Sequence, residues 1–320
     1  MLDPLGMAAF QTATRYWTVV ERNSQLLYFS GVIAYNRLLW TGIGFLSLLA
    51  TFRFFPFYVT GHELAHQWWG HQVIGHYARG SNMLSESLAQ YAALMVMEKE
   101  VGASSIRNYL KHELNRYLRG RGAERRKEEP LATVQRESYV WYQKGSLVFY
   151  ALKDYLGEER LNAALKQYVS RVKFQEPPYT NTTEFLNALR EATPDDMKYL
   201  ITDLFETITL FDNKAVEATY RETPDKKYVV KIKIKARKLR SDGLGKENEI
   251  AINDLVDIGI FTGEKKTEKA LFLEKRRITQ PEMEFEITVD QMPTRAGIDP
   301  YNKLIDRTPD DNAIAVVKAP

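Results

Sequence analysis

The feature that most constrains this chain of 320 residues is a His-Glu-x-x-His motif, which occupies His62 to His66. On an α-helix, residues four apart lie one turn apart on the same face, so both histidines can direct a ring nitrogen at one zinc ion. Glu63 lies about 100° further round the helix and is placed to act as a general base toward water at the metal. The alternative is a half-exposed amphipathic helix that carries two solvated histidines.

A third ligand separates these two interpretations, and Glu86 is the candidate. Nineteen residues after His66 comes Ser85, and Glu86 follows it. Residues 83–95 are expected to form a helix that begins near Ser85, with Glu86 in its first turn. An inward-facing carboxylate there would complete a His-His-Glu set and leave the fourth zinc position open. We therefore predict one zinc ion per chain, bound by His62, His66 and Glu86.

These residues carry a resemblance to a known family. The run His-Glu-Leu-Ala-His-Gln-Trp-Trp-Gly over 62–70, followed by the glutamate, resembles the gluzincin zinc aminopeptidases of the aminopeptidase N and leukotriene hydrolase kind. Residues 71–75 and 83–97 resemble bacterial members that are fused to ABC-transporter-type membrane proteins. The resemblance covers roughly residues 55–320. It implies a zinc metallopeptidase with a thermolysin-like helical catalytic region.

The third ligand departs from the family pattern. The family has Asn-Glu-Gly at this point, whereas this chain has Ser85-Glu86-Ser87, and its spacer from the second histidine is one residue longer. The ligand assignment stays with Glu86, because serine is not a usual zinc ligand. Gln90 follows Glu86 by one turn, and it either steadies a ligand or is a solvated surface residue.

The resemblance also implies a role for Tyr142. The segment from Trp141 to Gly145 matches the family's tyrosine before x-Lys-Gly, whose hydroxyl donates to the oxyanion of the tetrahedral intermediate. The alternative is that Tyr142 is an ordinary aromatic core residue on a helix.

One part of the family pattern is absent. The aminopeptidases carry a Gly-x-Met-Glu-Asn-type segment before the zinc helix, and its glutamate grips the free amine of the substrate. Nothing similar occurs between Met1 and Gly61. We therefore expect an internally truncated chain, in which a transporter-like segment is joined almost directly to the second half of a peptidase.

Residues 1–58 differ in character from the rest. The run from Leu38 to Phe52 holds no charged residue and lies between Arg37 and Arg53. As a helix it is slightly short for a hydrocarbon core ~30 Å thick, and the flanking arginines and aromatic residues can extend it. We expect a membrane-type helix here, as part of a transporter-like segment. The alternative is a buried helix of a soluble domain.

The charges around this run give an orientation. Arg15, Arg22 and Arg37 precede it, so the positive-inside rule places the catalytic part outside the cytoplasm. The expected location is the bacterial inner membrane.

Beyond residue 58 the pattern is first helical and then alternating. Residues 59–210 are expected to be mostly helical, with one helix over 158–173, and 119–130 as a charged solvated loop. From Val230 to Arg237 apolar and basic residues alternate strictly, which is typical of a strand with one buried face. We predict an antiparallel β-sandwich over 211–320. The fold class is α+β.

Composition excludes several classes of function. There are 44 basic and 41 acidic residues, so the net charge of +3 gives no field that favours nucleic acid. The absence of cysteine excludes thiolate metal sites and cysteine nucleophiles.

Two functional hypotheses follow. The leading one is a membrane-attached zinc metallopeptidase that hydrolyses a peptide or protein substrate, with Glu63 as general base and Tyr142 as oxyanion stabiliser. The alternative is a non-catalytic, zinc-binding accessory protein of the membrane or of an ABC-type transporter. A plain helical protein without metal is a third interpretation, which stoichiometric zinc would exclude.

Overall fold

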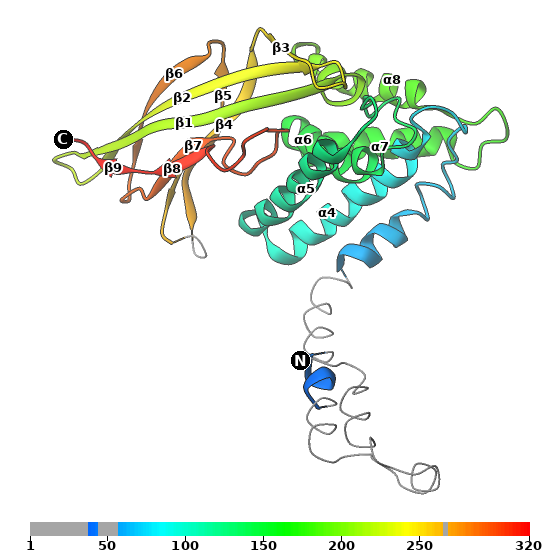
Figure 1. Cartoon of the computed structure of the whole chain (residues 1–320), viewed down its shortest axis with the longest axis horizontal. Coiled ribbons are helices and arrows are strands. Elements are labelled where there is room, and N and C mark those ends of the chain that lie inside the picture. The colour runs from blue at the N-terminus through cyan, green and yellow to red at the C-terminus, as the bar shows by residue number, and fades with distance from the viewer. Residues whose placement is uncertain (1–37, 44–56, 265–267) are drawn as a thin grey trace, which may run out of the picture. The chain divides into compact units, whose positions relative to one another are not determined.

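The computed structural model describes residues 38–43, 57–264 and 268–320 (Figure 1). Contacts between Cα atoms divide the chain into residues 1–59 and 60–320. In the first unit, residues 38–43 are helical. Among the described residues, no helix combines the length and the apolar character needed to cross a membrane. Residues 44–52 of the predicted membrane-type helix lie outside the described part of the chain.

The second unit begins with helices, which Figure 1 shows gathered at one end of the sheets. A short helix over 57–65 carries the first histidine of the motif. The helical elements that follow are η1 (Met83–Ser87), α4 (Leu88–Val101), α5 (Ala103–Ala123), η2 (Val140–Lys144), α6 (Gly145–Leu156), α7 (Glu158–Val172), α8 (Thr182–Ala192), η3 (Asp195–Met197), α9 (Tyr199–Ile201) and η4 (Thr202–Glu206).

The predicted helix over 158–173 is confirmed by α7. It buries Leu161, Leu165, Tyr168 and Val172, which recur at the spacing of one helix face. Gly157 precedes α7 and ends α6 with a φ of 86°, a conformation that costs glycine little. The two helices are thereby separated by a single residue and can fold back on one another.

The prediction of a solvated loop over 119–130 is wrong for residues 119–123 and for Glu128, whereas residues 124–130 do lack helix and strand and residues 125–127 are exposed. Helix α5 continues through two glycines to Ala123, and Glu128 is only 2 % exposed. Its carboxylate accepts hydrogen bonds from Tyr117 at 2.6 Å and from Arg121 at 2.8 Å. A buried carboxylate needs such partners, so this charged stretch is folded against α5.

The remainder of the second unit is a pair of sheets. The strands are β1 (Ile208–Glu222), β2 (Tyr228–Ser241), β3 (Glu247–Ile250), β4 (Asp254–Thr262), β5 (Lys269–Ile278), β6 (Glu282–Val289), β7 (Arg295–Ile298), β8 (Ala313–Ala315) and β9 (Val317–Lys318). One sheet has the order β3-β2-β1-β9, with β6 also paired to β2, and the other has the order β5-β4-β7-β8. Pairing is antiparallel apart from β1 with β9. The chain is thus a mixed α and β protein, as predicted.

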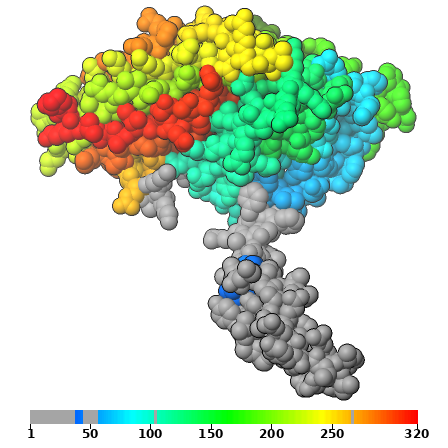
Figure 2. Space-filling view, in the orientation of Figure 1, coloured from blue at the N-terminus to red at the C-terminus, as the bar shows by residue number. Residues whose placement is uncertain are grey.

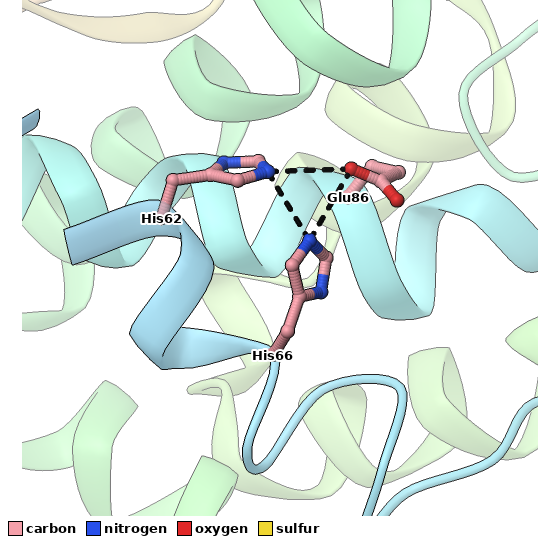
Figure 3. Close-up of side chains that lie close together, drawn as sticks. All are labelled: His62, His66 and Glu86. Atoms are coloured by element: carbon pink, nitrogen blue, oxygen red, sulfur yellow. Dashed lines mark hydrogen bonds and ion pairs between the residues drawn. The ribbon is translucent and has the colours of Figure 1, made fainter. Parts of the chain in front are cut away.

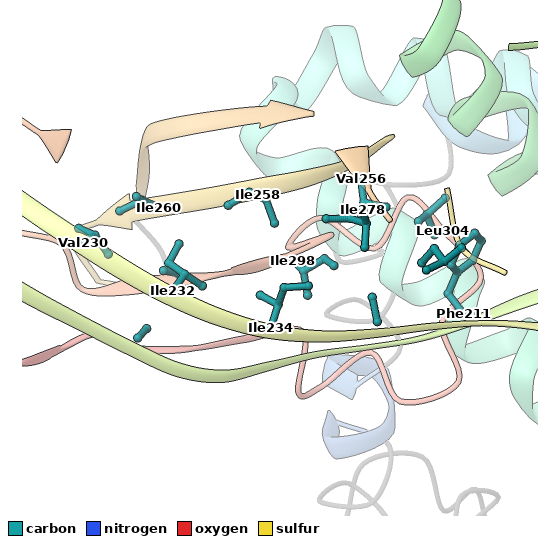
Figure 4. Close-up of a cluster of buried hydrophobic side chains, with 14 of the residues drawn as sticks. Phe211, Val230, Ile232, Ile234, Val256, Ile258, Ile260, Ile278, Ile298 and Leu304 are labelled. Carbon is teal, nitrogen blue, oxygen red and sulfur yellow. The ribbon is translucent and has the colours of Figure 1, made fainter. Parts of the chain in front are cut away.

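The strict alternation in β2 places its apolar side chains between the sheets. Val230, Ile232 and Ile234 are fully buried and pack with Ile258 and Ile298 of the other sheet (Figure 4). Burial of this kind contributes about 25 cal/mol per Å² of apolar surface. The apolar core of the two sheets lies between them, which is the arrangement of a sandwich.

The lysines of β2 face the opposite way. Lys231 pairs with Glu284 and Lys235 with Glu282, both at 2.9 Å, on the neighbouring strand β6. Cross-strand pairs of opposite charge stabilise a solvated face. These basic residues therefore belong to a row of cross-strand ion pairs between β2 and β6.

Two ion clusters, the first buried and the second half-buried, connect the helices to the sheets. In the first, the Nζ of Lys238 lies 2.5 Å from Asp203 of η4 and 2.9 Å from Asp254 of β4. In the second, Asp154 of α6 pairs with Lys303 at 2.6 Å and also with Lys275. Burial opposes ionisation of Asp154, and the two lysines nevertheless hold the pKa of its carboxyl below its usual value. The space-filling view shows helices and sheets of residues 60–320 in continuous contact (Figure 2).

The first cluster gives a test of this connection. Replacing Lys238 with Met leaves the buried carboxylate of Asp254 without its cation, while Asp203 keeps Arg240 at 2.6 Å, and we expect the free energy of unfolding to fall by about 3–5 kcal/mol. The matched control is Lys231→Met on the same strand, whose ammonium is exposed and screened by water. That variant should keep the stability of the parent. Urea unfolding measures both, and equal losses would contradict a structural role for the buried cluster.

Candidate metal centre

His62 and His66 are held by the helix over 57–65 and the turn that follows it. The helix ends at Ala65, and His66 is the first residue beyond it. The amide nitrogens of Gln67 and Trp68 bond to carbonyls three residues earlier, at 3.1 and 3.0 Å. The winding therefore continues past the helix end as a tighter turn. The two histidines remain on one side of this segment, as the motif predicts.

Glu86 is held by the second helical segment, which differs in its start from the prediction. The helical run begins at residue 81, and the turn over Met83–Ser87 is π-helical. A π turn holds one residue more than an α turn over the same length of helix. It therefore provides a place for the additional residue in the spacer between His66 and Glu86. The helix does not begin at Ser85.

The three predicted ligands converge on one point (Figure 3). Oε2 of Glu86 lies 3.4 Å from Nε2 of His62 and 3.6 Å from Nε2 of His66, and the two Nε2 atoms are 3.2 Å apart. Ligands about 2.1 Å from a zinc ion at tetrahedral angles are themselves separated by about 3.4 Å. Among the described residues, His62, His66 and Glu86 each offer one ligand atom, and these atoms lie close enough together to hold one metal ion.

The hydrogen bond of His66 orients its ring for this role. Its Nδ1 lies 2.9 Å from the carbonyl oxygen of Trp69 and donates to it. Nε2 is then unprotonated and faces the other two ligands, which is the tautomer that binds a metal. The carbonyl of Trp69 is a partner that the sequence pattern does not identify, because a backbone group leaves no signature in the sequence.

The charge state of Glu86 also suits a cation. Its hydrogen bond with His62 lowers the pKa of the carboxyl despite partial burial, and the hydroxyl of Tyr142 contributes a second hydrogen bond. The carboxylate is therefore ionised at neutral pH. Side-chain exposures of 12 % for His62, 20 % for His66 and 23 % for Glu86 leave an open side to the cluster.

Tyr142 and Glu63 lie beside the ligands. The rings of Tyr142 and His62 have centroids 6.0 Å apart. Burial raises the pKa of Tyr142, and the charges of Glu86 and Glu63 raise it further, so its hydroxyl remains a hydrogen-bond donor. Tyr142 is half-buried and Glu63 is exposed, which separates Tyr142 from an ordinary core residue. All five predicted site residues are brought together.

Two further residues belong to this region. Gln90 is 5 % exposed, so its interpretation as a solvated surface residue is wrong. Ser87 is fully buried next to Glu86, and no sequence pattern predicts a role for it. Its one signal in the sequence is that it stands where the family pattern has glycine.

Comparison with known proteins gives a family match. Residues 56–205 match the family described as the peptidase family M1 domain. Over 126 residues the chain is 28 % identical to human endoplasmic reticulum aminopeptidase 2. The matched region covers 37 % of this chain and 13 % of that protein. The chain thus spans only a small part of this relative.

Solved structures of peptidases are also similar. Aminopeptidase A of Legionella pneumophila, solved in complex with aspartic acid, matches with 18 % identity and a TM-score of 0.44, over 77 % of this chain and 26 % of that one. The M1 zinc metallopeptidase of Deinococcus radiodurans matches with 24 % identity and a TM-score of 0.38, over 45 % of this chain and 32 % of that one. The resemblance to members fused to transporters stays a prediction.

The ligand set is tested by removing each side chain in turn. Replacing His62, His66 or Glu86 with Ala should release most of the zinc, because two ligands hold the metal far more weakly than three. Glu63→Gln is the matched control on the same helix and should retain the metal. Elemental analysis of purified variants measures this. A Glu86→Ala variant with the zinc affinity of the parent would show that the third ligand is another group.

Proposed function

We propose that this chain is a zinc metallopeptidase of the aminopeptidase type, with Glu63 and Tyr142 as its catalytic residues. The observation that carries the proposal is the convergence of His62, His66 and Glu86 beside Tyr142 and Glu63. The match of residues 56–205 to a peptidase family supports it. The match takes in only 13 % of human endoplasmic reticulum aminopeptidase 2. That this chain is active by itself is therefore part of the proposal.

The ligands are suited to zinc rather than to a harder cation. Two imidazoles and one carboxylate are the set that catalytic zinc sites use, whereas calcium and magnesium prefer oxygen ligands. Bound zinc would polarise the scissile carbonyl and lower the pKa of a water molecule. We propose a single ion per chain.

We infer that Glu63 moves a proton. Glu63 is exposed and directly follows His62, and it is not one of the converging ligands. A carboxylate there accepts a proton from the attacking water and returns it to the leaving amine.

We infer that Tyr142 stabilises charge. Its hydroxyl is protonated at neutral pH, because its pKa is raised, and it lies beside the ligands. A donor so placed can bind the oxygen that becomes negative as the carbonyl is attacked.

The role of Tyr142 has a direct kinetic test. Tyr142→Phe should lower kcat by on the order of 10²–10³, the usual loss for one oxyanion donor, with little change in zinc content or KM. The matched control is Tyr139→Phe, because Tyr139 lies in the same segment and its buried hydroxyl has no partner among the described residues. That variant should keep the kcat of the parent. An unchanged kcat in Tyr142→Phe would remove Tyr142 from the mechanism, and a zinc-loaded parent without turnover would favour the non-catalytic alternative.

Specificity for a free amino terminus is a separate question. The resemblance assigns amine binding partly to a segment that the sequence lacks before Gly61. Loss of a buried charge-paired contact costs several kcal/mol, and each 1.4 kcal/mol is a factor of ten in rate. We expect aminoacyl reporters to be cleaved at least about a hundredfold more slowly than by a relative that carries this segment, with little preference for a free amine. Comparing kcat/KM for a free and an N-acetylated peptide measures this. Strong selection for the free amine would show that another acidic residue binds it.

Attachment to the bacterial inner membrane, with the catalytic part outside the cytoplasm, is proposed from the sequence alone. It is supported by the uncharged run over 38–52 between Arg37 and Arg53. A transporter-type partner rests only on the resemblance. Recovery of the chain from cells in a membrane fraction that resists alkaline extraction tests the attachment, and its release would contradict it.

A further inference from the structure

Glu86 and Tyr142 come from two π turns that pack against each other. Glu86 lies in η1 and Tyr142 in η2, and both turns also border α6. More than fifty residues of chain separate them. A hydroxyl that must reach the reacting oxygen needs its backbone held to within about 0.5 Å. The contact between η1 and η2 therefore decides where the hydroxyl of Tyr142 lies relative to the metal ligands.

One hydrogen bond joins these two turns next to the functional side chains. The hydroxyl of Ser87 donates to the carbonyl oxygen of Trp141 at 2.6 Å. Ser87 follows Glu86 directly and Trp141 directly precedes Tyr142. Ser87 is 0 % exposed, so water does not compete for this bond, and a hydrogen bond in such surroundings is stronger than one at the surface.

Gly145 allows this close approach. A Cβ atom at position 145 would lie 2.3 Å from Oγ and 2.6 Å from Cβ of Ser87, distances that real side chains do not adopt. The backbone of Gly145 is ordinary right-handed helix, with φ of −55° and ψ of −48°. Glycine is needed here for space rather than for its conformational freedom. Ser87 is thus seated in a recess that exists only because residue 145 lacks a side chain.

We propose that Ser87 is a positioning residue, whose hydrogen bond to the Trp141 carbonyl fixes η2 against η1 and so places the Tyr142 hydroxyl beside the metal ligands. This rests on the proposed function, because the purpose of the placement is oxyanion binding. Ser87 bonds to the backbone of Trp141 and acts through Tyr142.

The kinetic test uses the zinc-loaded full chain and a peptide substrate. Ser87→Ala removes the hydroxyl and keeps the Cβ, and kcat should fall about tenfold, less than the loss for Tyr142→Phe, with zinc content and KM unchanged. In the Tyr142→Phe background the same change should have no further effect, since there is no hydroxyl left to position. Equal losses of kcat in both backgrounds would overturn the proposal.

Ser146→Ala is the matched control. Ser146 is also 0 % exposed, and its hydroxyl donates to the carbonyl of Gln143 at 2.8 Å. That bond lies within the segment of η2 and α6 and does not join it to η1. The variant should therefore keep the kcat of the parent, and a loss equal to that of Ser87→Ala would show that any buried serine in this region has the same effect.

Exchanging the sizes of residues 87 and 145 distinguishes the effect of the hydrogen bond on kcat from the effect of packing. Gly145→Ala should lower kcat, because its Cβ would overlap Ser87. Adding Ser87→Gly leaves the Cα of residue 87 at 3.3 Å as the nearest atom, a tight but tolerable contact. The double variant restores the packing without the hydrogen bond, so its kcat should remain as low as that of Ser87→Ala. Recovery to the kcat of the parent would show that packing alone positions Tyr142.

A measurement that needs no catalysis tests the positioning role of Ser87 separately from the proposed peptidase function. With 3-fluorotyrosine at position 142, the ¹⁹F resonance of the zinc-loaded chain should move in Ser87→Ala and stay in place in Ser146→Ala, while circular dichroism shows both folded. An unmoved resonance in Ser87→Ala would overturn the positioning role. A moved resonance in a chain that cleaves no peptide would uphold that role and overturn the proposed function.

Discussion

The packing of the two π turns is the contact on which the rest of the site depends. It brings Glu86 from one helical segment and Tyr142 from another close to His62. Each turn holds an additional residue relative to an α-helix, and such turns are frequent at functional sites. Glu86 and Tyr142 are therefore held by the same contact between η1 and η2.

The sheets stabilise the helical region from one side. Lys238 on β2 lies between carboxylates from η4 and β4, and Asp154 on α6 lies between two lysines. Buried charges of this kind are costly to bring together and more costly to separate, so they fix one arrangement of helices and sheets. The helix α6 that begins at Gly145 is thereby held at both its ends, by η1 near its start and by the ion cluster near its finish.

Local patterns predicted much of this structure, and tertiary contacts account for what they missed. The spacing of His62 and His66 and the alternation in β2 are set by the geometry of one element, so each is visible in the sequence. Glu128 folds back onto Arg121 of α5, a contact between loop and helix that no local pattern contains. Ser87 was missed for the same reason: its partner is a backbone carbonyl in a distant segment.

X-ray absorption at the zinc edge of the metal-loaded chain shows whether two histidines and one glutamate hold the ion. We expect two imidazole ligands at about 2.0–2.1 Å and oxygen ligands for the remainder. In Glu86→Ala the two imidazoles should persist with an altered oxygen shell in whatever zinc remains. A spectrum with three imidazoles, or one unchanged by the loss of Glu86, would contradict the assignment.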